Sequence, residues 1–196
     1  LCKSDDLLDS ITPTVIMDGG LATDANKKLL RANGYHFLVN DKRTRRGAWS
    51  REFAADGFLA ITGRNPSHEV LVRMIELPAE QERLLLCKSA GRREKELAIR
   101  SGAELRLRPD LEKLDKRLRS GKLKDEDSAG QALGRLRERH SRVARYYDLR
   151  IEKVDGRLSL SWTRDDQRWS GDDELAGDYI LRTSRNDLSG PEIWSL

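Results

Sequence analysis

Cysteine and histidine are scarce in this sequence, and their positions exclude two kinds of site. The 196 residues include two cysteines and three histidines. Cys2 and Cys87 lie far apart without a partnering pattern, so the sequence predicts neither a disulfide framework nor a zinc site. The histidines, His36, His68 and His140, are scattered and do not change that conclusion. Scarce cysteine favours a reduced, cytoplasmic compartment.

Long apolar runs are also absent. No stretch approaches the roughly 18 apolar residues that a membrane span needs, and no segment has the pattern of a secretory signal peptide. Apolar residues make up 37% of the chain and charged residues 36%, and the charged fraction is well above the usual quarter. We therefore expect one domain, or one domain with an insertion, with a modest core, an ionised surface and no membrane partner.

Positive charge is clustered in two segments, although the net charge is only +4. The first is the block 42–46, and the second, from Arg135 to Arg150, holds six Arg against two acids. Arginine binds phosphate bidentately through its planar guanidinium, so both segments are candidates for contact with a polyanion. For either segment alone, a solvated charged surface is the commoner explanation. The candidate nucleic-acid contacts are Lys42, Arg43, Arg45, Arg46, Arg135, Arg139 and Arg142.

Residues 14–40 are predicted to form a strand, a helix and a second, parallel strand. The apolar run in Thr14–Met17 indicates a strand that is buried on both faces. Thr23 or Asp24 can cap a helix that ends at Gly34, and residues 35–40 form the second strand. This crossover implies a right-handed connection. The inner face of the helix is expected to consist of Leu21, Ala25, Leu29 and Leu30.

Asp18 directly follows the first strand and precedes two glycines, Gly19 and Gly20. A carboxylate in this position can bind a divalent cation without steric obstruction, and magnesium prefers carboxylate oxygens. From the spacing alone, a turn-forming Asp is favoured, because Asp-Gly is a common turn pair. The block 42–46 follows the second strand and should lie on the same side of the sheet as Asp18. A carboxylate beside a cationic wall suits a polyanionic substrate that is handled through a metal ion.

The middle of the chain is predicted to contain a strand pair and a long helical region. Residues 70–77 and 83–87 form the two strands, which a short helix at 50–56 precedes. From about residue 92 to 147, leucines three and four residues apart predict an antiparallel helical hairpin that turns at Gly121. Pro109 is expected to break the first helix or to lie in the first turn of a new one.

The last third of the chain returns to short elements. Residues 147–153 and 157–164 are predicted to be strands on either side of an Asp-Gly turn. A polar connection through residues 171–173 leads to another strand at 177–183. Ser189 is expected to cap a final helix.

Two motifs near the ends of the chain resemble those of a known enzyme family. The first is residues 15–23, with Asn26 and the two leucines at 29 and 30, followed by the strand at 35–39 and the basic block. The second is residues 177–183 together with 188–194. Through these motifs the chain resembles the central and C-terminal part of DDE-type insertion-sequence transposases of the IS-four-like superfamily. The charged helical region is similar to the insertion that this family carries.

The resemblance implies metal-dependent cleavage of double-stranded DNA at transposon ends, followed by strand transfer. Three acids, Asp, Asp and Glu, hold two Mg²⁺ ions in this family, and Asp18 matches the second Asp. The first Asp is expected upstream of Leu1, and the Glu on a helix after the one that begins near Ser189. The chain is therefore expected to be a fragment that is inactive alone and exposes a sheet edge and apolar surface. Assembly of such enzymes on paired ends favours a homodimer.

The expected fold is α/β, with a partial RNase H-like core that a helical hairpin and its flanking strands interrupt. Residues 1–68 form the core segment that carries Asp18, residues 69–176 the insertion, and residues 177–196 the return to the core. The alternative from another class is a non-catalytic module that binds nucleic acid or a partner through the hairpin, with Asp18 as a turn residue. A magnesium-dependent nuclease with the same core is a third possibility.

Overall fold

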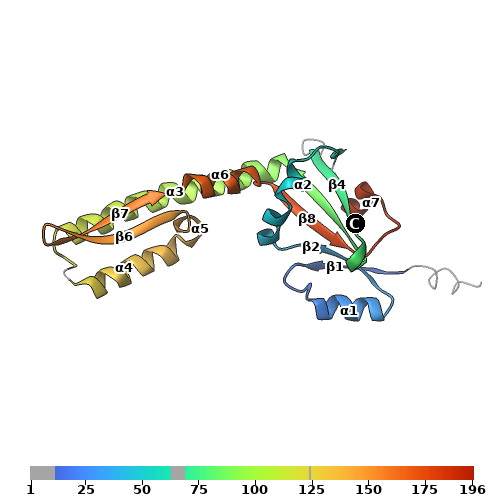
Figure 1. Ribbon diagram of the computed structural model, residues 1–196, viewed down its shortest axis with the longest axis horizontal. Coiled ribbons are helices and arrows are strands. Elements are labelled where there is room, and N and C mark those ends of the chain that lie inside the picture. Colours follow the sequence, from blue (N-terminus) through green and yellow to red (C-terminus); the bar gives the residue numbers. More distant parts are fainter. Residues whose placement is uncertain (1–11, 63–68, 124) are drawn as a thin grey trace, which may run out of the picture. The chain divides into compact units, whose positions relative to one another are not determined.

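A computed structural model describes residues 12–62, 69–123 and 125–196, which form two compact units (Figure 1). Unit 1 consists of the chain up to Arg93 together with Gly177–Leu196, and unit 2 is Glu94–Ala176. Cys2 and His68 lie outside the described residues. Within the described residues, no helix is both long and apolar enough to cross a membrane.

Unit 1 is built on a mixed six-stranded sheet in the order β1-β2-β8-β5-β4-β3. β1 and β2 are parallel and are joined by helix α1, whereas the other neighbouring pairs are antiparallel. The α/β class, the parallel strand-helix-strand segment and the β4–β5 pair are therefore confirmed. The elements of the segment and sheet are β1 (Thr14–Asp18), α1 (Asp24–Ala32), β2 (His36–Asn40), β3 (Leu59–Thr62), β4 (Glu69–Leu77), β5 (Glu82–Ser89) and β8 (Asp178–Thr183).

Local sequence signals explain where the helices of unit 1 begin and end. The hydroxyl of Thr23 accepts a hydrogen bond from the backbone amide of Asn26 (3.1 Å), which caps α1. Gly34 follows α1 with φ +74°, a conformation that glycine adopts without strain. Ser189 and Glu192 form a reciprocal capping box at the last helix. The remaining helices are η1 (Arg43–Trp49), α2 (Ser50–Ala54), η2 (Pro78–Glu80) and α7 (Gly190–Ser195).

The two faces of the sheet are packed differently. One face carries an apolar cluster in which Leu38, Leu85 and Cys87 pack with Ile193 of α7. The other face of the sheet carries Phe37 of β2, which is fully buried. Arg31 of α1 lies 5.3 Å from the centre of the Phe37 ring, a distance that permits a cation–π contact. Helix α1 therefore covers its face of the sheet largely with charged side chains.

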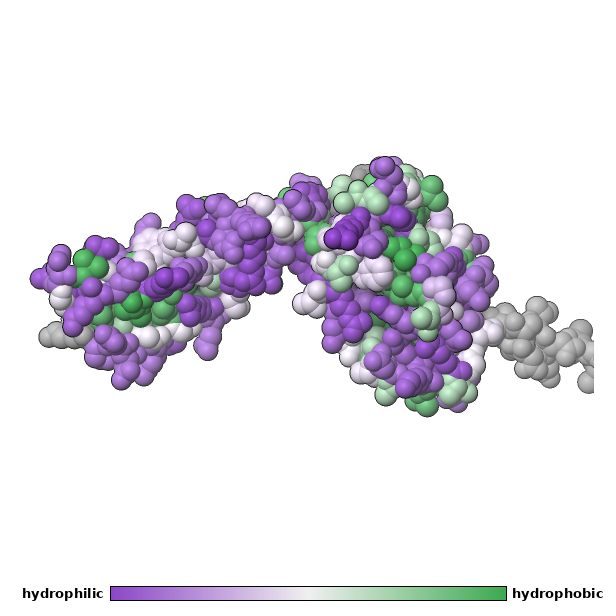
Figure 2. Space-filling view, in the orientation of Figure 1, coloured by the Kyte–Doolittle hydropathy of each residue, from purple (hydrophilic) through white to green (hydrophobic). Residues whose placement is uncertain are grey.

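Two expectations about β1 and α1 are wrong. Ile16 is 61% exposed, and Leu21 and Leu29 are each 62% exposed. β1 is the edge strand of the sheet and pairs only with β2 among the described strands, so it is not buried on both faces. α1 turns Lys27 toward the sheet instead of Leu29. Figure 2 shows hydrophilic residues over much of the visible surface of unit 1, with apolar residues scattered among them. Among the described residues, the outer edge of β1 is unpaired and the apolar side chains of Ile16, Leu21 and Leu29 are exposed.

Unit 2 is organised around a helical hairpin that packs with a strand pair in one core. The predicted leucine seam of the first helix, including Leu107 and Leu111, is buried with Leu136 of the second helix and Leu160 of a strand. Gly121, with φ +74°, lies between the helices as predicted. The elements are α3 (Ala90–Arg119), α4 (Glu126–Arg139), α5 (Ser141–Ala144), β6 (Tyr147–Val154), β7 (Arg157–Arg164) and α6 (Asp166–Glu174).

Two further expectations differ from the structure. α3 is continuous through Pro109 instead of breaking there. Residues 171–173 belong to helix α6 and are not a polar connection. β4 and β5 pair within the main sheet, and the boundary between the two compact units falls after Arg93. The chain returns to unit 1 at Gly177.

The unbroken α3 generates a stability prediction. Pro109 removes one backbone hydrogen bond from the helix interior, and its ring crowds the preceding turn. Pro109→Ala should therefore stabilise unit 2 by about 1–3 kcal/mol, less any loss from a more flexible unfolded chain. Thermal and urea unfolding followed by circular dichroism would measure this. Glu112→Ala, an exposed substitution in the same helix, should change stability by less than about 0.5 kcal/mol. Equal or lower stability of Pro109→Ala would contradict the prediction.

Candidate functional site

Asp18 is the last residue of β1 and lies beside Asn40, the last residue of β2. Its side chain is exposed, and its Oδ1 accepts a hydrogen bond from the amide of Gly19 (2.7 Å). The amide of Leu21 donates to the backbone carbonyl of Asp18 (2.9 Å), which closes the turn. The carboxylate is thus held by its own turn at the carboxyl ends of two parallel strands, where open α/β sheets bind ligands.

Gly19 brings this turn against the end of β2. A Cβ atom at residue 19 would lie 2.6 Å from the carbonyl oxygen of Asn40 and 3.4 Å from the amide nitrogen of Lys42. Real Cβ atoms essentially never lie within 3.0 Å of another heavy atom outside their own neighbours, so any residue other than glycine would force this backbone to shift. Gly20, in contrast, has open space around its Cβ position. The turn that carries Asp18 therefore touches the backbone at the start of the basic block, as predicted from the order of the elements.

The basic block 42–46 includes one residue that cannot contact a phosphate. Arg46 is 5% exposed, and its Nη1 donates a hydrogen bond to the backbone carbonyl of Asp178 (3.2 Å). Its guanidinium therefore anchors the segment to β8, which corrects the assignment of Arg46 as a nucleic-acid contact. Lys42, Arg43 and Arg45 are exposed. Arg45 lies 3.4 Å from Asp41 but keeps 56% of its side chain exposed.

A second carboxylate, Asp41, lies at the same end of the sheet but is already paired. Its side chain is 6% exposed, and its two oxygens lie 3.4 Å from Arg45 Nη1 and from Arg182 Nε. Within the described ranges, no three Asp, Glu, His or Cys side chains lie together in a way that could hold a metal ion. The residues present offer Asp18 as a single ligand and do not form a complete site for two magnesium ions.

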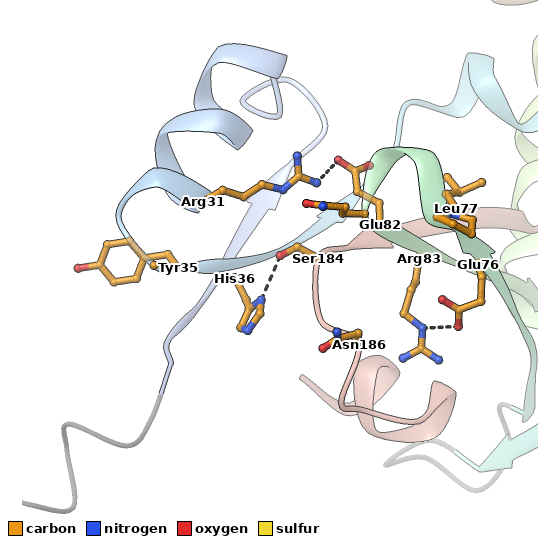
Figure 3. A pocket seen from close by; sticks show the side chains of 12 residues that line it. Arg31, Tyr35, His36, Glu76, Leu77, Glu82, Arg83, Ser184 and Asn186 are labelled. Atoms are coloured by element: carbon orange, nitrogen blue, oxygen red, sulfur yellow. Dashed lines mark hydrogen bonds and ion pairs between the residues drawn. The ribbon is translucent and has the colours of Figure 1, made fainter.

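A cleft of about 540 Å³ opens at the other end of β2 (Figure 3). Its charged side chains are largely paired with one another: Arg83 Nε lies 2.7 Å from Glu76, and Arg31 lies 2.7 Å from Glu82. His36 Nδ1 lies 3.3 Å from the hydroxyl of Ser184. No sequence pattern indicated this cleft, because three segments that are far apart in the chain, 31–36, 76–83 and 184–186, contribute its lining.

Glu82 is the most heavily compensated acid of unit 1. Its side chain is 2% exposed and binds Lys27 (3.1 Å), Arg31 (2.7 Å) and Arg182 (2.6 Å). Burial alone would raise the pKa of Glu82, but hydrogen bonds from Arg182 and Lys27 outweigh burial and lower it. This ion cluster joins α1 to strands β5 and β8, so it holds the helix after Asp18 on the sheet.

Cys87 and two of the tryptophans pack in or beside the hydrophobic cores. Cys87 is fully buried, and burial raises the pKa of its thiol to about 12, so it is not a nucleophile near neutral pH. Trp194 donates a hydrogen bond to the hydroxyl of Tyr179 (2.8 Å) beside Cys87. Trp169 packs against the core of unit 2, where its ring contacts that of Tyr146 edge-on at 5.1 Å.

Unit 2 contains a basic groove between α3 and α4, with a volume of about 260 Å³. The predicted residues Arg135 and Arg139 line it from α4, whereas Arg142 is exposed but lies outside the lining. Two residues that the sequence analysis missed, Lys113 and Arg117, line it from α3. They flank the seam residue Leu114, so the leucine spacing contained a signal that could have found them. We call this the α3–α4 groove.

Asp110 is the acid of the α3–α4 groove. Its carboxylate lies 2.9 Å from His140 Nε2, 3.4 Å from Lys113 and 3.6 Å from Arg139. The hydrogen bond with His140 holds the pKa of Asp110 below its usual value. Within the described part of the chain, Arg117 and Arg135 have no acidic partner. The groove is therefore strongly positive where these two guanidinium groups lie.

Comparison of the chain with protein-family models, curated proteins and solved structures gave no match. The functional argument therefore depends on the side chains themselves. Two regions carry it: the turn at Asp18 with the exposed part of the basic block in unit 1, and the α3–α4 groove in unit 2.

The contact at Gly19 predicts different effects for two neighbouring glycines. Gly19→Ala should destabilise unit 1 by about 1–3 kcal/mol, because the added methyl group collides with the end of β2. Gly20→Ala is the matched control, since its Cβ meets nothing within 4 Å, and should change stability by less than about 0.5 kcal/mol. Urea unfolding would compare the two. Equal effects would show that the turn does not press against β2 in solution.

The ion cluster at Glu82 predicts a pH-dependent stability. Glu82→Gln should cost about 3–5 kcal/mol at neutral pH, because Lys27 and Arg182 lose their shared counter-charge. The pKa of Glu82 in the folded chain is lower than its value of 4.5 in the unfolded chain. Ionised Glu82 therefore stabilises the fold above pH 4.5, and this stabilisation is lost as the pH falls through the pKa of the folded chain. The difference between native and variant unfolding free energies should therefore shrink below about pH 4.5. Glu76→Gln, at a more exposed pair, should cost about 1 kcal/mol or less. A difference that grows in acid would contradict the assignment.

Proposed function

We propose that this chain is part of a DDE-type transposase, in which Asp18 is one of three acids that serve metal-dependent cleavage and strand transfer on double-stranded DNA. The observation that carries the proposal is the position of Asp18. Its exposed carboxylate ends a strand of a mixed sheet, and its turn touches the basic block. A carboxylate in such a place is open to a cation and to a phosphate that the cation would bind.

The open edge of β1 supports an RNase H-like arrangement for the complete core. β1 pairs only with β2 among the described strands, and Ile16 is 61% exposed beside it. An unpaired edge with apolar side chains nearby is a surface that proteins normally cover. A strand that carries the first Asp would, in this proposal, pair with that edge and place its carboxylate near Asp18.

The exposed cations near Asp18 support a nucleic-acid substrate. Lys42 and Arg45 follow β2 directly, and Arg45 keeps more than half of its side chain in solvent. Cations in this position attract DNA phosphates, and the attraction weakens as salt rises.

Asp18 would supply one ligand to Mg²⁺ in the complete enzyme, with the other ligands from the two acids that the family resemblance implies. A homodimer on paired DNA ends belongs to the same proposal.

One observation favours a second function, a non-catalytic module that binds nucleic acid through the helical hairpin. The α3–α4 groove gathers four cations in unit 2 without any contribution from Asp18. In that function Asp18 only forms a turn, which its hydrogen bond with the Gly19 amide would also explain. The two functions differ in whether the carboxylate of Asp18 is needed once DNA is bound.

Replacement of Asp18 in a longer polypeptide that carries both flanking regions separates these functions. Asp18→Asn keeps the size of the side chain but removes its charge, so magnesium-dependent cleavage of transposon ends should fall by at least about a thousandfold. Asp24→Asn is the matched control, because Asp24 is an exposed acid near the same turn, and it should leave cleavage nearly unchanged. The 196-residue chain alone should not nick such DNA. Full cleavage by Asp18→Asn would rule out the catalytic function and favour the binding module.

A further inference from the structure

We propose that the α3–α4 groove binds the phosphate backbone of duplex DNA and provides an attachment site that does not involve Asp18. The groove lies entirely within unit 2, and its lining includes residues that sequence motifs did not single out. Its binding of a polyanion follows from its own charges. Only the choice of DNA as the polyanion rests on the proposed function.

The two helices place two rows of cations opposite each other. Lys113 and Arg117 are one helical turn apart on α3, and Arg135 and Arg139 are one turn apart on α4. The helices are antiparallel, because Asp110, before the turn at Gly121, contacts residues at the far end of α4. Each row therefore forms one wall of the groove, and a phosphate that enters meets cations from both sides.

The charge of the groove is uneven along its length. Asp110 pairs with Lys113, Arg139 and His140, so the positive charge at that end is partly neutralised. Arg117 and Arg135 have no acidic partner within the described residues, and both are exposed. Unpaired guanidinium groups lose no existing ion pair when they bind a phosphate, and they can bind it bidentately. These two arginines are the expected centre of the site.

The other lining residues indicate which part of a nucleic acid would bind. They are Leu114, Ala132 and Leu136, which form an apolar floor. None of the eight lining residues is aromatic, so the groove has no platform for the stacking of unpaired bases. The lining therefore suits contacts with backbone phosphates, which give affinity without sequence preference.

The test is the salt dependence of binding by the whole 196-residue chain. Binding to a short fluorescent DNA duplex of arbitrary sequence is measured by anisotropy in the presence of EDTA, over a range of salt concentrations. The double variant Arg117→Gln with Arg135→Gln should lower the slope of log K against log salt by about 2, because two phosphate contacts are lost. The control Lys116→Gln with Lys122→Gln removes the same charge outside the groove and should change the slope by less than about 0.5.

Removal of a negative charge from the groove tests the same site in the opposite direction, because affinity should then rise. Asp110→Asn removes the acid of the lining and frees Lys113 and Arg139, so affinity for the duplex should rise severalfold. Circular dichroism spectra identical to that of the native chain would show that each variant is folded. A loss of affinity in this folded variant would overturn the proposal.

Further outcomes distinguish this inference from the proposed catalytic function. Equal slopes of log K against log salt for the groove variant and its control would show that the groove does not bind DNA phosphates. That result would leave the proposed role of Asp18 in cleavage intact. Tighter binding of single-stranded DNA or of RNA, lost in the groove variant, would overturn the assignment of duplex DNA.

Discussion

The insertion of β8 between β2 and β5 is the constraint on which unit 1 depends. Without β8 the sheet would fall into two pieces, β1-β2 and β5-β4-β3, because no other strand of the described residues joins them. β8 also fixes the region near Asp18. The amide of Asp41 donates to Ile180 of β8 (2.8 Å), Arg46 donates to the carbonyl of Asp178, and Arg182 pairs with Glu82. A strand that the chain reaches only after the whole of unit 2 therefore positions the segment next to the candidate carboxylate.

Much of this fold could be predicted from local pattern, and the failures share a cause. Alternating and heptad spacing identified the hairpin and most strands, because each element buries one face within a few residues. The burial of β1 and α1 could not be predicted, since it depends on strand order, and an edge strand with the sequence Val15-Ile16-Met17 resembles a central one. The continuity of α3 through Pro109 also depends on tertiary packing. Buried leucines on both sides of the proline hold the helix together, although the proline removes a backbone hydrogen bond.

The candidate sites show the same division between local and tertiary information. Asp18 and its glycine turn were found from adjacent residues, and the structure places them where the order of elements predicts. Arg46 was assigned by composition alone, yet it is buried against β8, because a guanidinium can satisfy backbone carbonyls as well as phosphates. Lys113 and Arg117 lie beside a seam leucine, which is a local signal, but they become part of a basic groove because α4 brings Arg135 and Arg139 opposite them.

The contrast between Asp18 and Asp41 shows why only one of these neighbouring acids is open to a cation. Asp41 is nearly buried between Arg45 and Arg182, so a metal ion that bound its carboxylate would have to displace two cations. Asp18 is exposed, and among the described residues its carboxylate binds only the amide of Gly19, which leaves one oxygen free. Asp41 also holds the basic block in place through Arg45. The buried acid therefore positions the cations, while the exposed acid remains available to a ligand.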